Sequence, residues 1–170
     1  MPKLADSNIW LALTLSKHAF HRVARQWFDR MPTGDTVLFC RSTQQSYLQL
    51  LTTAQVLAPY GIAPLSNAAA WTAYAGWFDS GCVVFMNEPR GLDSYWEKLA
   101  VSETPSPKVW MDAYLAAFAV SGGYQLVTTD QGFRQIGCLD ALTENRKLPN
   151  APRQGGNLTV AFHDFRARRR

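Results

Sequence analysis

A helical segment that leads directly into a short apolar strand is the feature that most constrains this chain. Ser106 and Pro107 are typical of a helix start, because serine caps free N–H groups and proline suits the first turn. The apolar run 114–120 continues the helix, and the glycines at 122–123 end it. The next residues, 124–128, predict a buried strand. A helix followed by such a strand is a unit of an α/β sheet, in which ligands bind at the carboxyl ends of the strands.

Short apolar segments alternate with segments of helical periodicity along the whole chain. The predicted strands are 3–6, 36–40, 82–86, 124–128 and 158–162. The predicted helices are 9–15, 19–31, 44–51, 68–78, 92–101 and 107–120. The segment 55–67 carries two prolines and a glycine and is predicted to be mostly a connection. Parallel strands need crossover helices, so the pattern predicts an α/β fold with a mostly parallel five-stranded sheet covered on both faces.

Composition limits the class of protein. The chain has 170 residues, of which 47% are hydrophobic and 18% charged, so it is expected to form one globular domain spanning 1–170. No apolar run reaches the roughly 18 residues of a membrane helix, and the N-terminal residues lack the apolar stretch of a signal peptide. We therefore expect a cytoplasmic protein that does not insert into a membrane.

The cysteines and the basic residues give weaker signals. Cys40, Cys82 and Cys138 form no CxxC pair, which argues against a structural zinc or a disulfide framework, and the first two are expected to be plain buried residues. The net charge is +4, and four arginines stand at the C-terminal end: Arg166, Arg168, Arg169 and Arg170. They follow a predicted loop at 147–157. Such a tail can attract a phosphate backbone, or it can simply be a solvated terminus.

Three acidic residues share one structural context. Asp6 follows the first predicted strand, Asp112 lies early in the helix before the fourth strand, and Asp130 follows that strand. In a right-handed α/β sheet all three can meet at one edge. Clustered carboxylates repel one another and are costly to bury, and a hard cation such as Mg²⁺ or Mn²⁺ removes that conflict. The three together predict a metal site.

Each acid also has a plainer interpretation. Asp6 and Asp130 can each cap a following helix, and for either residue alone the cap is the better explanation. Asp112 lies beyond the cap, among apolar neighbours, where an uncompensated charge is costly. Asn8 and Thr128 are candidate supporting residues, which could hold a phosphate or hydrogen-bond a carboxylate. The three histidines are scattered without ligand spacing and are given no chemical role.

The chain resembles the PIN-domain ribonucleases, in particular the VapC-type toxins of bacterial toxin–antitoxin pairs. The matching segments are LADSNIWLALTLSKHAFHRVARQWF, FCRSTQQSYLQLLT, SPKVWMDAYLAAFA and LVTTDQGF, which span most of 4–133. The resemblance implies a three-layer α/β/α fold, a homodimer and an Mg²⁺- or Mn²⁺-dependent endoribonuclease. It assigns metal-site roles to Asp6, Asp112 and Asp130 and a supporting role to Thr128. It also implies a VapB-type antitoxin that inserts a segment near the site.

One position departs from the family pattern. Family members usually place a glutamate early in the helix after the second strand, whereas this chain has Gln44. An amide oxygen can accept a hydrogen bond or ligate weakly, but it brings no charge. We expect this change to weaken a second metal site most, and three acids still define one site.

These observations favour a metal-dependent endoribonuclease that cleaves structured RNA, either transfer RNA or ribosomal RNA. The main alternative is a catalytically weakened PIN-like domain that serves as an RNA- or protein-binding module, with Gln44 as the sign of lost catalysis. A third possibility is a phosphatase-like metal hydrolase on a similar sheet. Titration with Mn²⁺ separates the first two, and cleavage of structured RNA but not of a small phosphate ester excludes the third.

Overall fold

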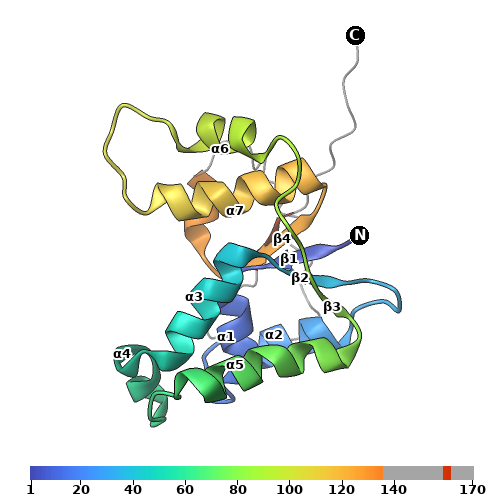
Figure 1. Cartoon of the computed structure of the whole chain (residues 1–170), viewed down its shortest axis with the longest axis vertical. Coiled ribbons are helices and arrows are strands. Elements are labelled where there is room, and N and C mark those ends of the chain that lie inside the picture. The colour runs from blue at the N-terminus through green and yellow to red at the C-terminus, as the bar shows by residue number, and fades with distance from the viewer. Residues whose placement is uncertain (136–158, 162–170) are drawn as a thin grey trace.

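A twisted sheet forms the centre of the molecule (Figure 1). The structure, a computed structural model, describes residues 1–135 and 159–161. The strands are β1 (Lys3–Ala5), β2 (Val37–Phe39), β3 (Val83–Phe85), β4 (Gln125–Thr128) and β5 (Thr159–Ala161). Their order across the sheet is β3-β2-β1-β4-β5. The first four are parallel, and β5 pairs antiparallel with β4 at one edge. The expected α/β fold with a mostly parallel sheet is confirmed.

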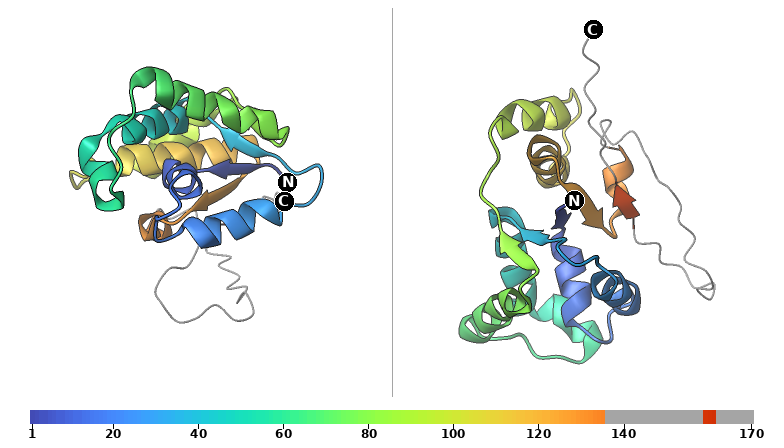
Figure 2. Two further views of the ribbon diagram at one scale, coloured as in Figure 1. Left: turned by 90° about the horizontal axis from the view of Figure 1, so that it is seen from below. Right: turned by 90° about the vertical axis from the view of Figure 1, so that its right-hand side faces the viewer.

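Helices cover both faces of this sheet. They are α1 (Ser7–Thr14), α2 (His21–Asp29), α3 (Arg41–Thr52), α4 (Ala54–Leu57), α5 (Asn67–Gly76), α6 (Leu92–Ala100) and α7 (Val109–Gly122). Figures 1 and 2 show α6 and α7 on one face and α1, α2, α3 and α5 on the other. Each face has its own apolar cluster, one around Trp10 and Phe39 and the other around Phe118 and Leu126. Because both faces of the sheet are covered, every residue of β2 and β4 is buried, and β2 is a continuous apolar run rather than an alternating one.

The helix that precedes β4 ends where the sequence indicates but begins later. Gly123 takes a left-handed φ of 66°, a conformation that glycine adopts without strain. Its N–H donates to the carbonyls at the end of α7. The expected cap at Ser106 is wrong, because α7 begins at Val109 with Lys108 at the N-cap position. The backbone carbonyl of Ser106 instead accepts the N–H of Val109 in a preceding turn. Asp112 still lies in the first turn of α7.

Three further local predictions need correction. The segment 55–67 is not mostly connection, because α4 and a 3₁₀ turn, η1 (Ala58–Tyr60), occupy its first half. The helix predicted at 44–51 begins at Arg41, because Thr43 Oγ1 accepts the N–H of Cys40 (3.0 Å) and caps it earlier. The helical spacing of Trp71 from Tyr74 and Trp77 predicts that all three face the core, but Trp71 is 55% exposed on α5. Helical spacing alone could not tell which aromatic residues of that helix face inward.

Other predictions fall wholly or partly outside the described residues. The strand expected at 158–162 is present as β5 over 159–161. The predicted loop at 147–157, Cys138 and the arginine tail are outside the described part of the chain. Cys40 is buried as expected, whereas Cys82 is partly exposed. Within the described residues, no helix combines the length and the apolar character needed to cross a bilayer.

Candidate active site

Asp6 is a buried carboxylate at the end of the central strand β1. It is only 7% exposed, and its backbone N–H donates to the Val127 carbonyl of neighbouring β4 (2.9 Å). Asp6 occupies the N-cap position of α1, yet its side chain forms no capping bond to that helix. Its carboxylate instead accepts hydrogen bonds from Thr128 Oγ1 (2.8 Å) and Ser7 Oγ (3.2 Å). The capping interpretation therefore does not describe what this side chain does.

Thr128, the last residue of β4, forms hydrogen bonds that connect Asp6 and Asn8 with the backbone of Asp130. Its buried hydroxyl donates to Asp6 Oδ2, and it accepts from Asn8 Nδ2 (3.2 Å) and from the backbone N–H of Asp130 (3.0 Å). Asn8 also accepts the N–H of Thr129 through Oδ1 (3.4 Å). Adjacent parallel strands end at the same edge of the sheet, so residues about 120 positions apart form one network.

Asp130 lies at the outer end of this network. Its Oδ1 accepts the backbone N–H of Gly132 (2.7 Å), and its Oδ2 accepts from Lys108 Nζ (2.9 Å). The Gly132 hydrogen bond, followed by the Lys108 charge, holds the pKa of Asp130 below its usual range. One oxygen of Asp130 thus caps the turn at 131–135, as the plainer interpretation expects, while the other faces a cation.

Asp112 approaches the same region from α7. A Cβ placed on Gly132 would lie 3.1 Å from Asp130 Oδ1 and 3.7 Å from Asp112 Oδ2, so the two carboxylates flank this glycine. Partial burial raises the pKa of Asp112, the charge of Lys108 opposes this rise, and the charges of Asp130 and Asp6 add to it. Burial likewise raises the pKa of Asp6, against the lowering effect of the Thr128 hydrogen bond. The three acids therefore interact electrostatically across the end of the sheet.

Lys108 is a functional candidate that the sequence interpretation missed. Its ammonium forms an ion pair with Asp130, and the pKa of Lys108 is raised by that bond and by the charges of Asp130, Asp112 and Asp6. The side chain is otherwise well exposed. Its spacing of four residues from Asp112, in adjacent turns, was the available signal. A positive charge at this position partly relieves the repulsion among the acids.

Gln44 is not hydrogen-bonded to the acids. Its Oε1 accepts from an Arg41 guanidinium N–H, and its side chain also bonds to Tyr74, on the α3–α5 side of the sheet. Among residues 1–135 and 159–161, no three His, Cys, Asp or Glu side chains are close enough together to form a ready-made metal site. The donor set of three mutually repelling carboxylates still fits a hard cation in chemical type. Binding one would require the carboxylates to draw together and Lys108 to leave Asp130.

The sequence of this chain is similar to those of known proteins. Residues 3–138 match the family model described as PIN domain. The chain belongs to the PIN-domain family. Ribonuclease VapC41 of Mycobacterium tuberculosis is 52% identical to this PIN domain over 138 residues, which are 81% of this chain and 94% of the relative. Ribonuclease VapC44 of the same organism is 28% identical, over 77% of this chain and 87% of the relative. The PIN domain is therefore of the VapC type.

Two solved structures share its fold. The crystal structure of VapC20 from Mycobacterium tuberculosis, described as a sarcin-ricin loop cleaving toxin, superposes with a TM-score of 0.58 at 20% identity. The superposition covers 79% of this chain and 95% of VapC20. VapBC2 from Rickettsia felis, solved bound to a DNA fragment from its promoter, gives a TM-score of 0.55 at 11% identity, over 81% of this chain and 94% of that one.

Proposed function

We propose that this PIN domain is a cytoplasmic Mg²⁺- or Mn²⁺-dependent endoribonuclease and the toxin of a toxin–antitoxin pair. The observation that carries the proposal is the hydrogen-bonded network in which Thr128 joins Asp6 to the segment bearing Asp130, with Asp112 opposite. The 52% identity to a protein named ribonuclease supports the same activity. Structured RNA is the proposed substrate, with the sarcin-ricin loop of ribosomal RNA and transfer RNA as the two candidates.

The residues of the network have distinct roles. Asp6, Asp112 and Asp130 would hold the divalent ion, which, when bound, supplies positive charge that stabilises the anionic phosphate and makes water a better nucleophile. Thr128 fixes the carboxylate of Asp6, and Asn8 fixes Thr128 from α1. One of the three acids would accept a proton from the attacking water. Lys108, once released from Asp130, can contact a substrate phosphate from the solvent side.

The direct test is cleavage of a sarcin-ricin-loop RNA and a transfer RNA by the purified chain, with Mg²⁺, Mn²⁺ or EDTA. We expect cleavage only with metal, and Asp112→Asn is expected to lower the rate by at least about a hundredfold. Asp93→Asn is the matched control, because Asp93 is an exposed acid in the first turn of α6. Equal rates for both variants, or cleavage that survives EDTA, would contradict the proposal.

A binding module without catalysis is the second candidate. It is favoured by the ion pair that Lys108 forms with Asp130 and by Gln44, whose amide is engaged by Arg41. Its signature would be RNA affinity with no cleavage at any metal concentration. Calorimetry with Mn²⁺ then decides between the candidates, because the nuclease requires binding that is lost in Asp112→Asn.

The proposed partners are a VapB-type antitoxin and a second copy of the chain. The VapC names of its relatives and the fold shared with a VapBC2 complex support the first. The second rests on family resemblance. Co-expression with the product of a neighbouring small gene, followed by light scattering on the purified complex, tests both.

A further inference from the structure

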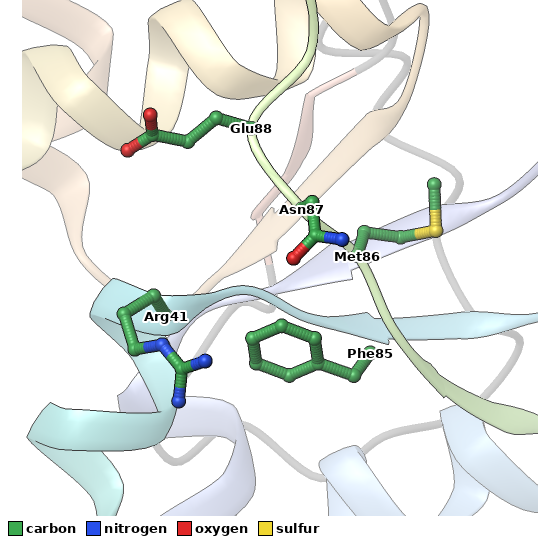
Figure 3. Close-up of a pocket in the computed structure, with 5 residues that line it drawn as sticks. All are labelled: Arg41, Phe85, Met86, Asn87 and Glu88. Carbon is green, nitrogen blue, oxygen red and sulfur yellow. The ribbon is translucent and has the colours of Figure 1, made fainter.

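A cavity of about 410 Å³ lies at the carboxyl ends of β2 and β3, the edge of the sheet at which Asp6 follows β1. It is lined by Arg41, Phe85, Met86, Asn87 and Glu88 (Figure 3). Arg41 begins α3 directly after β2, and the other four end and follow β3, so all five lie at the carboxyl ends of the strands. None of the acids of the candidate active site is among them. The volume falls in the range of about 300–1,000 Å³ that small-molecule sites occupy.

Arg41 and Phe85 lie against each other in the lining of this cavity. The Arg41 guanidinium carbon lies 4.8 Å from the centre of the Phe85 ring, in a cation–π contact. The same guanidinium donates to Gln44 Oε1, which fixes its orientation while leaving other N–H groups free to donate. Figure 3 shows the guanidinium beside the Phe85 ring, with the amide of Asn87 between Arg41 and Met86. Aromatic rings and guanidinium planes are surfaces on which unpaired RNA bases stack.

The rim of the cavity carries hydrogen-bonding groups of both kinds. Asn87 offers an amide, and Glu88 offers a carboxylate that is held in place by the hydroxyl of Tyr114 (2.9 Å). The charges of Arg41 and Glu88 oppose each other, so the cavity is formally neutral. A phosphate would be attracted by one and repelled by the other, whereas a neutral planar ligand with donors and acceptors matches both. A nucleobase has these properties.

We propose that this cavity binds an unpaired base of the RNA substrate, stacked against Arg41 and Phe85 and contacted at its edge by Asn87 and Glu88. The proposal deepens the proposed nuclease function and rests on RNA being the substrate. Because the cavity shares the sheet edge with Asp6 and Thr128, a base held here would place a nearby phosphate toward the acids. The cavity would thereby contribute to the choice of cleavage site.

The first experiment separates a base from a phosphate as the ligand. The four ribonucleoside monophosphates and ribose 5-phosphate are titrated into the isotope-labelled chain without metal, and amide shifts are followed by NMR. We expect the nucleotides to shift the amides of Phe85, Asn87 and Glu88, and ribose 5-phosphate to leave them unchanged. Equal shifts from ribose 5-phosphate, or no shifts at these residues from any nucleotide, would overturn the proposal.

The second experiment measures affinity for a single-stranded RNA oligonucleotide in the Asp112→Asn background, where cleavage is blocked. Arg41→Ala and Phe85→Leu are expected to weaken binding by roughly 5- to 100-fold, the effect of losing one stacked base. Arg90→Ala is the control, because it removes the same charge from an exposed residue outside the cavity. Equal losses of RNA affinity in Arg41→Ala and Arg90→Ala would show that Arg41 acts only through its positive charge, and would refute the base site.

The two proposals can fail separately. If the chain does not cleave RNA, base binding in the cavity would still appear in both experiments, because neither uses metal or catalysis. If the cavity does not bind a base, cleavage with metal would persist, and Arg41→Ala would change its rate no more than Arg90→Ala does.

Discussion

Replacing Thr128 by valine tests whether the network at the end of β4 holds the candidate active site together. The hydroxyl is fully buried and makes three hydrogen bonds: to Asp6 Oδ2 (2.8 Å), from Asn8 Nδ2 (3.2 Å) and from the N–H of Asp130 (3.0 Å). Valine has nearly the same shape, so the change leaves no cavity. The loss therefore measures the hydrogen bonds rather than the packing.

The magnitude follows from the burial of each partner. A hydrogen bond to a charged group contributes about 1.5–3 kcal/mol, and Asp6 is too buried for water to replace the lost donor. Asn8 and Asp130 are partly exposed, so water can satisfy them at smaller cost. We expect the free energy of unfolding to fall by about 2–4 kcal/mol at pH 7.

The loss should also depend on pH in a defined direction. The hydrogen bond from Thr128 lowers the pKa of Asp6, so removing it raises that pKa further. A group whose folded pKa exceeds its unfolded value of about 3.9 destabilises the fold as pH rises through that window. The difference in stability between the wild type and Thr128→Val should therefore shrink as the pH is lowered from 7 toward 4.

Urea denaturation followed by tryptophan fluorescence, at pH 7 and at pH 5, measures both effects. Thr129→Val is the matched control, because the adjacent hydroxyl makes no hydrogen bond within the described residues. A loss in Thr129→Val as large as that in Thr128→Val would refute the reasoning. A loss in Thr128→Val that is the same at both pH values would show that the network does not act through the charge of Asp6.

The remaining predictions concern the charges around this network. Asp6→Asn should raise the free energy of unfolding at pH 7 by about 1.4 kcal/mol for each unit by which the pKa of Asp6 in the folded chain exceeds its unfolded value, and denaturation at pH 4 should show the gain disappear. Lys108→Met should tighten Mn²⁺ binding several-fold in calorimetry, because the ion no longer displaces an ammonium from Asp130, whereas the exposed Lys98→Met should not. Gly132→Ala should lower cleavage and Mn²⁺ affinity with little change in stability, because its methyl group would lie 3.1 Å from Asp130 Oδ1. Wild-type Mn²⁺ affinity in Gly132→Ala would show that Asp130 does not bind the ion.

Much of the fold could be predicted because strong local signals agreed with one another. A continuous apolar run predicted β2, the short segment 124–128 after two glycines predicted β4, and the same glycines predicted the end of α7. Helix starts were less predictable, as at Ser106 and Arg41, because a cap depends on which side-chain oxygen meets which N–H. The exposure of Trp71 was missed for a similar reason, since spacing does not show which face of α5 meets the sheet.

The sequence by itself determined the order of strands and helices and supplied carboxylates after β1, after β4 and within α7, because these properties depend on local patterns. Only the tertiary structure decided that Lys108 pairs with Asp130 and that the Arg41 guanidinium lies over the Phe85 ring. These contacts join different elements, and hydrogen bonds and charge–charge interactions at such sites depend on separations of a few ångströms. No spacing along one chain fixes distances of that kind before the elements pack.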